Sequence, residues 1–248
     1  MHCLRGFRPA LGLACFSAIA TGTMNGAMVT ALKRKGILKN QAVEDAMKSV
    51  DRGLFVPRKE SAYQDAPVPI GFGATISAPH MHAHCLELLA EVLKPGARVL
   101  DVGSGSGYLT AVMAYMVRDG DKGRVLGVEH VTELVKRSTQ CVEQLEFAKE
   151  MMETGNLKII KGDGQIGYSE CAPYDCIHVG AAAPEVPQPL VDQLKVGGRL
   201  LIPVGPKGTM QNLTMVVRAL DGSVQSKEIM EVVYVPLTSL SNQLSPWE

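Results

Sequence analysis

The residues with the clearest chemical potential are three glycines at alternate positions, Gly103, Gly105 and Gly107, which directly follow the apolar run 98–102. Glycine has no Cβ to keep a ligand away from the backbone, and the N–H groups that begin the next helix add polarity. The spacing therefore predicts a ligand-binding loop, which includes Ser104, against which an adenosyl or phosphate group packs.

The same spacing bears on which cofactor the loop binds. The dinucleotide fingerprint requires its third glycine one position later, where this chain has Tyr108. A nicotinamide cofactor, and with it a dehydrogenase, is therefore disfavoured. Asp101 suits instead a ligand whose methionine part carries an ammonium group, which it would organise directly or through the loop. The alternative is an aspartate that only ties down the loop.

Acidic residues also follow two other apolar runs. Glu129 directly follows the run 124–128. Its carboxylate suits a ribose diol, because it can accept a hydrogen bond from each of the two hydroxyl groups. Asp163 and Gly164 follow the run 157–161 and suit the amino group and the ring of adenine. Because the carboxyl ends of parallel strands share one crevice, these strand ends predict a single nucleoside-binding site.

The elements that must hold these residues alternate between helices and strands. Helices are expected at 41–51, 79–93, 108–117 and 132–152, and strands at 98–102, 124–128, 157–161, 176–179, 199–204, 213–219 and 229–235. This alternation predicts an α/β fold, a doubly wound, Rossmann-like, mostly parallel seven-stranded sheet with helices on both faces. The turn at 221–223 leaves room only for an antiparallel hairpin at one edge.

The chain is expected to form one domain at 28–248, with an N-terminal cap at 28–94 and a cofactor-binding core at 95–248. Residues 1–27 are interpreted as a variable extension, either disordered or a mitochondrial or secretory targeting signal, because basic residues precede a short apolar run. The thiol-rich, disulfide-poor body favours the cytoplasm.

Composition limits the partners that the chain can have. Its 25 basic and 25 acidic residues leave no overall positive field to gather nucleic acid, and no later segment is a candidate for an integral membrane span. The six cysteines lack the spacing of a zinc ribbon. His80, His82 and His84 would point to different faces of a helix, so no metal site is expected.

Four longer runs narrow the function: 70–82 (IGFGATISAPHMH), 173–184 (PYDCIHVGAAAP), 194–200 (LKVGGRL) and 234–238 (YVPLT). These runs resemble the protein L-isoaspartate O-methyltransferases. The strand, glycine and acidic pattern between residues 95 and 205 is similar to the wider class I S-adenosylmethionine-dependent methyltransferases. The resemblance extends over about residues 28–248.

The resemblance implies transfer of a methyl group from S-adenosylmethionine to the free α-carboxylate of L-isoaspartyl residues in damaged proteins and peptides. The product is S-adenosylhomocysteine, and the methyl ester then cyclises to a succinimide. No metal is implied, and the enzyme is expected to act as a monomer. Ser77 corresponds to the family's active-site serine. The positions that join the loop and strand-end residues in binding the cofactor are Ala74, Thr75, Ile76, Ser77, His82, Thr238 and Gln243.

The chemistry of such an acceptor sets the role of Ser77. A carboxylate is already an anion at neutral pH, so the reaction needs no general base, and proximity and removal of water supply most of the rate. Ser77 is therefore interpreted as an orienting residue and not as a nucleophile. Two other functions are left open, a small-molecule methyltransferase with the same cofactor site and a non-catalytic methyltransferase-like adaptor.

Overall fold

The computed structural model describes residues 13–118 and 123–245 of the chain. The helices are α1 (Leu13–Arg34), α2 (Gln41–Ser49), α3 (Pro79–Leu89), α4 (Tyr108–Val117), α5 (Thr132–Val142), α6 (Glu146–Glu153), α7 (Gln188–Asp192) and α8 (Leu240–Leu244). The strands are β1 (Val68–Gly71), β2 (Ala74–Ile76), β3 (Arg98–Val102), β4 (Arg124–Glu129), β5 (Leu157–Lys161), β6 (Tyr174–Val179), β7 (Leu194–Val204), β8 (Gln211–Arg218) and β9 (Val224–Val232).

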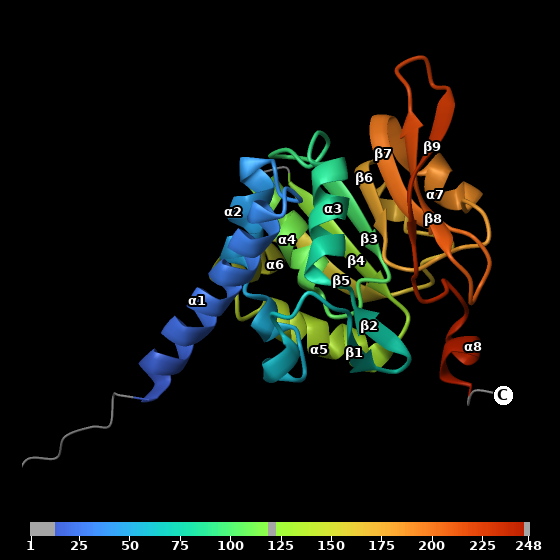
Figure 1. Cartoon of the computed structure of the whole chain (residues 1–248). Coiled ribbons are helices and arrows are strands. Elements are labelled where there is room, and N and C mark those ends of the chain that lie inside the picture. Colours follow the sequence, from blue (N-terminus) through green and yellow to red (C-terminus); the bar gives the residue numbers. More distant parts are fainter. Residues whose placement is uncertain (1–12, 119–122, 246–248) are drawn as a thin grey trace, which may run out of the picture.

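Seven of these strands form one sheet in the order β5-β4-β3-β6-β7-β8-β9. β3 pairs in parallel with both β4 and β6, whereas β8 is antiparallel to both β7 and β9. The hairpin of β8 and β9 forms one edge of the sheet, and its tip projects beyond the other strands in Figure 1. The predicted mostly parallel seven-stranded fold with an antiparallel edge is therefore confirmed.

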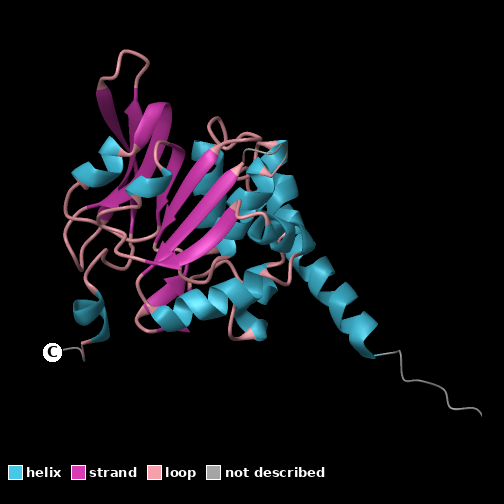
Figure 2. Ribbon diagram, turned by 180° about the vertical axis from the view of Figure 1, so that it is seen from behind, coloured by secondary structure: helices cyan, strands magenta, loops and turns pink. Residues whose placement is uncertain are grey.

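Helices cover the two faces of the sheet unequally. Successive residues of a strand point to opposite faces. Val99 accordingly joins a large buried cluster with side chains from α1 to α6, whereas Leu100 joins a smaller cluster to which α7 contributes Leu190 and Val191. Figure 2 looks onto the sheet from behind, where the strands are largely visible. Helices lie on both faces, as predicted, but mostly on one.

The helix predicted at 132–152 is two helices, α5 and α6. The chain turns at Leu145, whose φ of −95° and ψ of 115° are extended and not helical. The turn lets each helix bury its own apolar face, with Leu134 and Val142 buried on α5 and Met151 on α6. The amphipathic pattern is continuous across the turn, which is why periodicity alone predicted one helix.

The last strand also begins earlier than the predicted 229–235. The Asp221 carboxylate accepts the backbone N–H of Ser223 at 2.9 Å and closes a tight turn, so β9 starts directly afterwards at Val224. Residues 233–235 lie beyond β9 and lead towards the carboxyl end of the parallel strands, where Val235 accepts a backbone hydrogen bond from Ala182 at 2.8 Å.

The boundary expected after residue 27 falls inside α1. Met28, Val29 and Leu32 on this helix are buried in the large cluster. The polar side chain of Asn25 on the same helix is also buried. The contacts of the domain therefore begin before residue 28. Residues 1–12 of the expected extension lie outside the described residues. Within the described part of the chain, no helix combines the length with the apolar character needed to cross a membrane.

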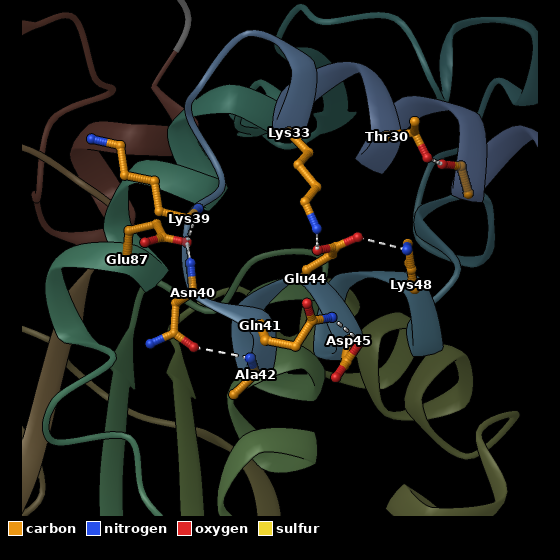
Figure 3. Close-up of polar contacts among 11 residues, drawn as sticks. Thr30, Lys33, Lys39, Asn40, Gln41, Ala42, Glu44, Asp45, Lys48 and Glu87 are labelled. Atoms are coloured by element: carbon orange, nitrogen blue, oxygen red, sulfur yellow. Dashed lines mark hydrogen bonds and ion pairs between the residues drawn. The ribbon is translucent and has the colours of Figure 1, made fainter.

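Polar contacts join α1, α2 and α3 into the N-terminal cap (Figure 3). The Glu44 carboxylate on α2 accepts from Lys33 on α1 at 2.5 Å and from Lys48 at 2.6 Å. Glu87 on α3 accepts the backbone N–H groups of residues 39–40, just before α2. The lysine ends of these ion pairs are exposed although Glu44 is buried. Ion pairs at the surface contribute about 1 kcal/mol or less each, so these contacts mainly set how the helices meet.

Asn25 on α1 satisfies the C-terminal end of α2. Its side-chain nitrogen donates to the carbonyl oxygens of Met47 at 3.0 Å and Val50 at 3.4 Å, and its oxygen accepts the backbone N–H of Arg52 at 3.3 Å. The last carbonyl groups of a helix have no partner within the helix. Because Asn25 is buried, no solvent replaces it there.

We predict that Asn25→Ala lowers the free energy of unfolding by about 2 kcal/mol or more, because several buried backbone groups lose their partner. Gln41→Ala is the matched control, because it removes only an exposed hydrogen bond to Asp45 and should cost less than about 0.5 kcal/mol. Denaturant unfolding of both variants measures the difference. Equal stabilities of the two variants would contradict this role of Asn25.

Candidate active site

The strand order reverses between β3 and β6, and a cleft opens there beyond the carboxyl ends of the strands. It consists of an outer hollow of about 560 Å³ on the side of β4 and an inner hollow of about 340 Å³ beside β3 and β6. Thr75, Gly103, Gly105 and Gly180 belong to the walls of both hollows. The two hollows are therefore parts of one site.

Most residues predicted for the site line this cleft. The outer hollow is lined by Ala74, Thr75, Gly103, Gly105, Glu129, Gly164, Thr238 and Gln243. The inner hollow is lined by Thr75, Ile76, Ser77, His82, Asp101, Gly103, Ser104 and Gly105. Of the predicted positions, Gly107 and Asp163 line neither hollow.

The glycine loop needs its glycines for two reasons. Gly103, Gly105 and Gly107 have φ values of 71°, 50° and 81°, in the left-handed region that favours glycine. A Cβ on Gly107 would also lie 3.0 Å from the Cβ of Ser138 on α5. Gly107 thus supports the loop from behind, while Gly103 and Gly105 form its exposed wall.

Glu129 is held by the backbone around it. Its Oε2 accepts the N–H of Gly105 at 3.1 Å, and its Oε1 accepts the N–H of Val131 at 2.9 Å. Glu129 is buried and lines the outer hollow. Each carboxylate oxygen has a second lone pair, so the side chain is oriented to accept from a ligand with neighbouring hydroxyl groups.

Asp163 and Gly164 separate in the structure. Gly164 lines the outer hollow, and a Cβ there would lie 2.5 Å from Cγ1 of Val102, so any larger residue would displace the wall. The Asp163 carboxylate accepts the N–H of Gln165 at 2.9 Å and closes the turn. The geometry therefore supports a role for Asp163 in shaping the turn that presents Gly164.

The C-terminal tail forms the far wall of the outer hollow. Gln243 on α8 accepts from Nε2 of His130 at 2.8 Å and donates to the carbonyl oxygen of Phe72 at 2.8 Å. Gln243 thereby joins the end of β4 to the β1–β2 hairpin across the cleft. This hairpin also carries Thr75.

Ser77 lies between β2 and α3, in the wall of the inner hollow. Ala78 is the N-cap of α3 and Pro79 its first residue, as the sequence predicted. A helix N-terminus carries unpaired N–H groups and a partial positive charge. The surroundings of Ser77 therefore favour an anionic ligand.

Asp101 is buried, and both of its oxygens are hydrogen bonded within the protein. Oδ2 accepts from the Thr110 hydroxyl on α4 at 2.5 Å, and Oδ1 accepts from Nδ1 of His178 on β6 at 2.8 Å. Burial lowers the pKa of His178, but hydrogen bonds with Asp101 and Cys85 outweigh it and raise the pKa to about 10. Asp101 thus ties the end of β3 to α4 and β6 beside the glycine loop, and His178 is a cation next to it.

Arg52, which sequence patterns did not single out, lies buried behind the inner hollow. Its Nη1 is 3.2 Å from Nδ1 of His82, and its Nε donates to the carbonyl oxygen of Ala62 at 2.8 Å. Burial, and then the charges of Arg52 and His178, lower the pKa of His82 well below its usual value. His82 is therefore neutral where His178 is charged.

His178 and Arg52 differ in whether the sequence alone could have identified them as site residues. His178 lines the inner hollow, stands two residues before Gly180 and pairs in register with Asp101 across adjacent strands, so the strand alignment points to it. Arg52 meets His82 only through the fold of the cap.

Within the described ranges, no cluster of three or more histidine, cysteine or acidic side chains is arranged to hold a metal ion.

We predict that His178→Gln has a lower free energy of unfolding than the parent chain, and that this difference is largest below about pH 6.5. Because folding raises the pKa of His178 from 6.5 to about 10, the protonated ring stabilises the fold fully below the unfolded pKa, and this stability is lost as the pH rises through the folded pKa. The gap should therefore narrow between about pH 7 and pH 10.

Denaturant unfolding across this pH range measures the gap. His84→Gln is the control, because the pKa of His84 is lowered, chiefly by burial, so its gap should show no trend above about pH 7. A gap for His178→Gln that stays constant up to about pH 10 would contradict a charged His178.

Comparison with known proteins gives a consistent result. A family model described as protein-L-isoaspartate(D-aspartate) O-methyltransferase matches residues 23–242. The protein-L-isoaspartate O-methyltransferase of Triticum aestivum is 50% identical over 232 residues, which cover 94% of this chain and 99% of that protein. Protein-L-isoaspartate O-methyltransferase 1 of Arabidopsis thaliana is 54% identical over 220 residues, which cover 89% and 94%.

Solved structures agree with these relatives. A crystal structure of a protein-L-isoaspartate O-methyltransferase from Plasmodium falciparum, in complex with S-adenosyl-L-homocysteine, has a TM-score of 0.79 and 38% sequence identity. The similarity covers 86% of this chain and 98% of that one. The chain therefore belongs to the protein-L-isoaspartate (D-aspartate) O-methyltransferase family.

Proposed function

We propose that this chain transfers a methyl group from S-adenosylmethionine to the free α-carboxylate of L-isoaspartyl residues in damaged proteins and peptides, and so begins their return to aspartate through a succinimide. The observation that carries the proposal is the division of one cleft into two adjoining hollows with a shared glycine wall. One hollow suits a nucleoside and the other an anion. The bound S-adenosyl-L-homocysteine in the Plasmodium falciparum relative supports this cofactor.

The outer hollow fits the adenosyl part of the cofactor. Glu129, oriented by the N–H groups of Gly105 and Val131, accepts hydrogen bonds from the ribose diol. Gly164 leaves room that a Cβ would fill, so a flat ring can lie against the backbone there. When bound, S-adenosylmethionine supplies a methyl group activated by its positive sulfur.

The inner hollow fits an acceptor that is already an anion. Ser77 and His82 provide hydrogen-bond donors in its wall, and His178 adds a positive charge that Asp101 partly balances. Neither side chain needs to remove a proton, because the acceptor carboxylate is ionised at neutral pH. Ser77 and His82 orient one oxygen of the acceptor carboxylate and take the place of the water that solvates it.

The site also bears on the two alternative functions. A methyltransferase that acts on a hydroxyl or an amine often needs a general base, and the neutral His82, whose pKa is lowered by burial, is a poor one. A non-catalytic adaptor has no need for the cofactor walls, yet the glycine loop and Glu129 are both present. Repair of isoaspartyl residues accounts for both hollows.

We further propose that the enzyme acts as a monomer in the cytoplasm, through one domain in which the cap supplies Ser77 and His82 and the core supplies the cofactor walls. The free thiols of Cys85, Cys141, Cys171 and Cys176 support a reducing compartment.

We predict that the chain methylates a synthetic peptide with an L-isoaspartyl linkage and leaves the same peptide with a normal L-aspartyl linkage unmethylated. Transfer of labelled methyl from S-adenosylmethionine, followed by base treatment to release the ester, measures this. No transfer to either peptide, together with demonstrated binding of S-adenosylhomocysteine, would shift the assignment to a small-molecule enzyme or an adaptor.

We predict that Ser77→Ala lowers turnover about tenfold or more, because the acceptor loses an orienting hydrogen bond, while the Kd for S-adenosylhomocysteine changes by less than about threefold. Ser61→Ala is the matched control, because its exposed hydroxyl bonds only to the carbonyl oxygen of Arg58. Methyl-transfer kinetics and titration calorimetry separate the two effects. Unchanged turnover in Ser77→Ala would remove this assignment.

A further inference from the structure

We propose that Arg52 is a positioning residue that acts through His82. Its buried guanidinium fixes His82 as a neutral ring with the proton on Nε2, so that His82 donates a hydrogen bond to a carboxylate in the inner hollow. The proposal rests on the proposed function for the identity of that carboxylate, but the state of the ring is a property of the protein alone.

The geometry determines where the proton lies. A guanidinium group only donates hydrogen bonds, so Nδ1 of His82, 3.2 Å from Nη1 of Arg52, must accept. In a neutral imidazole the other nitrogen then carries the proton. Because His82 lines the inner hollow, its Nε2–H is the group that remains for a ligand.

Arg52 has no carboxylate in direct contact among the residues that the structure describes. The carboxylate of Asp65 stabilises its charge only from beyond ion-pair distance, and the buried Nη2 of Arg52 has no hydrogen-bond partner. Burial lowers the pKa of Arg52 to about 10, so the group is still a cation at neutral pH. A buried cation without a carboxylate partner is costly, and an anion held by His82 would offset part of that cost.

The hydrogen bond at Nδ1 of His82 runs in the opposite direction from the one at Nδ1 of His178. There, a carboxylate accepts from Nδ1 and favours the charged ring. At His82, a cation donates to Nδ1, which withdraws electron density and makes Nε2–H a better donor. Burial lowers the pKa of His82 most, and the charged or titratable groups that face it, Arg52, His178 and His80, lower it further. The ring therefore stays neutral when an anion is absent.

Aromatic packing holds the pair in place. The ring of Tyr108 lies 5.0 Å from that of His82, and the guanidinium of Arg52 lies 5.6 Å from the same tyrosine ring. Phe55 packs edge-on against Tyr108. Since Tyr108 is the first residue of α4, directly after the glycine loop, Arg52 links the cap to the loop that faces the ligand.

Two carboxylates enter the cleft in the proposed reaction, that of the isoaspartyl acceptor and that of the methionine part of the cofactor. Both offer the same anionic oxygen to His82. Separate binding measurements with an isoaspartyl peptide and with S-adenosylhomocysteine distinguish them.

The test compares Arg52→Met, which removes the donor, with Arg52→Lys, which keeps the charge. Asn25→Ala is the matched control, because Asn25 bonds the backbone of Arg52 and not its side chain. Nitrogen-15 NMR of labelled histidine reports which ring nitrogen of His82 is protonated. Methyl-transfer kinetics give KM for the peptide, and calorimetry gives Kd for S-adenosylhomocysteine.

In Arg52→Met, His82 should lose its single Nε2–H form, and either the peptide KM or the Kd should rise about tenfold or more. A rise in KM alone identifies the acceptor carboxylate, and a rise in Kd alone identifies that of the cofactor. Arg52→Lys should recover part of the loss, and Asn25→Ala should leave the tautomer and both constants unchanged.

An unchanged His82 tautomer in Arg52→Met would overturn the proposal, and so would equal effects of Arg52→Met and Asn25→Ala on the binding constants. The NMR and calorimetric readouts need no methyl transfer. If the parent chain methylated no peptide, the proposed function would fail while the role of Arg52 could still be judged from these two readouts.

Discussion

The buried carboxylate of Asp101 is the constraint on which the active-site end of the sheet depends. An ionised carboxylate taken out of water costs several kcal/mol unless its oxygens are hydrogen bonded, and here the partners are Thr110 on α4 and His178 on β6. These bonds hold the end of β3, the start of α4 and the end of β6 together around the glycine loop. The walls that Gly103 and Gly180 contribute to both hollows depend on this arrangement.

The charges around the cleft divide it into two environments. At the inner hollow, His178 and Asp101 are paired in the wall, and the cation Arg52 lies behind His82, so the local balance favours an anionic ligand. At the outer hollow, Glu129 faces the ligand as a hydrogen-bond acceptor. An enzyme that joins an anionic acceptor to a positively charged methyl donor needs this polarity more than it needs a base.

Much of the fold followed from local signals, because strand and helix periods and the glycine spacing depend on neighbours in sequence. The parallel core, the edge hairpin and the start of α3 were predictable for that reason. The break at Leu145 was not, because no proline or change of pattern marks it. The early start of β9 was missed because its first residues are exposed and show no buried alternation, although the turn at 221–223 was predicted. The pairing of Arg52 with His82 needs the cap to fold onto the core, and no sequence spacing encodes it.

The predicted site residues likewise differ in whether local sequence signals placed them correctly. Glu129 and Gly164 were placed from strand ends, and both line the cleft, whereas Asp163 closes the turn beside it. The most direct test of this site is a crystal structure of the chain with S-adenosylhomocysteine and an L-isoaspartyl peptide. We expect the adenosyl part beside Glu129 and Gly164, and the acceptor carboxylate in the inner hollow beside Ser77. A peptide carboxylate bound outside the inner hollow would contradict this assignment.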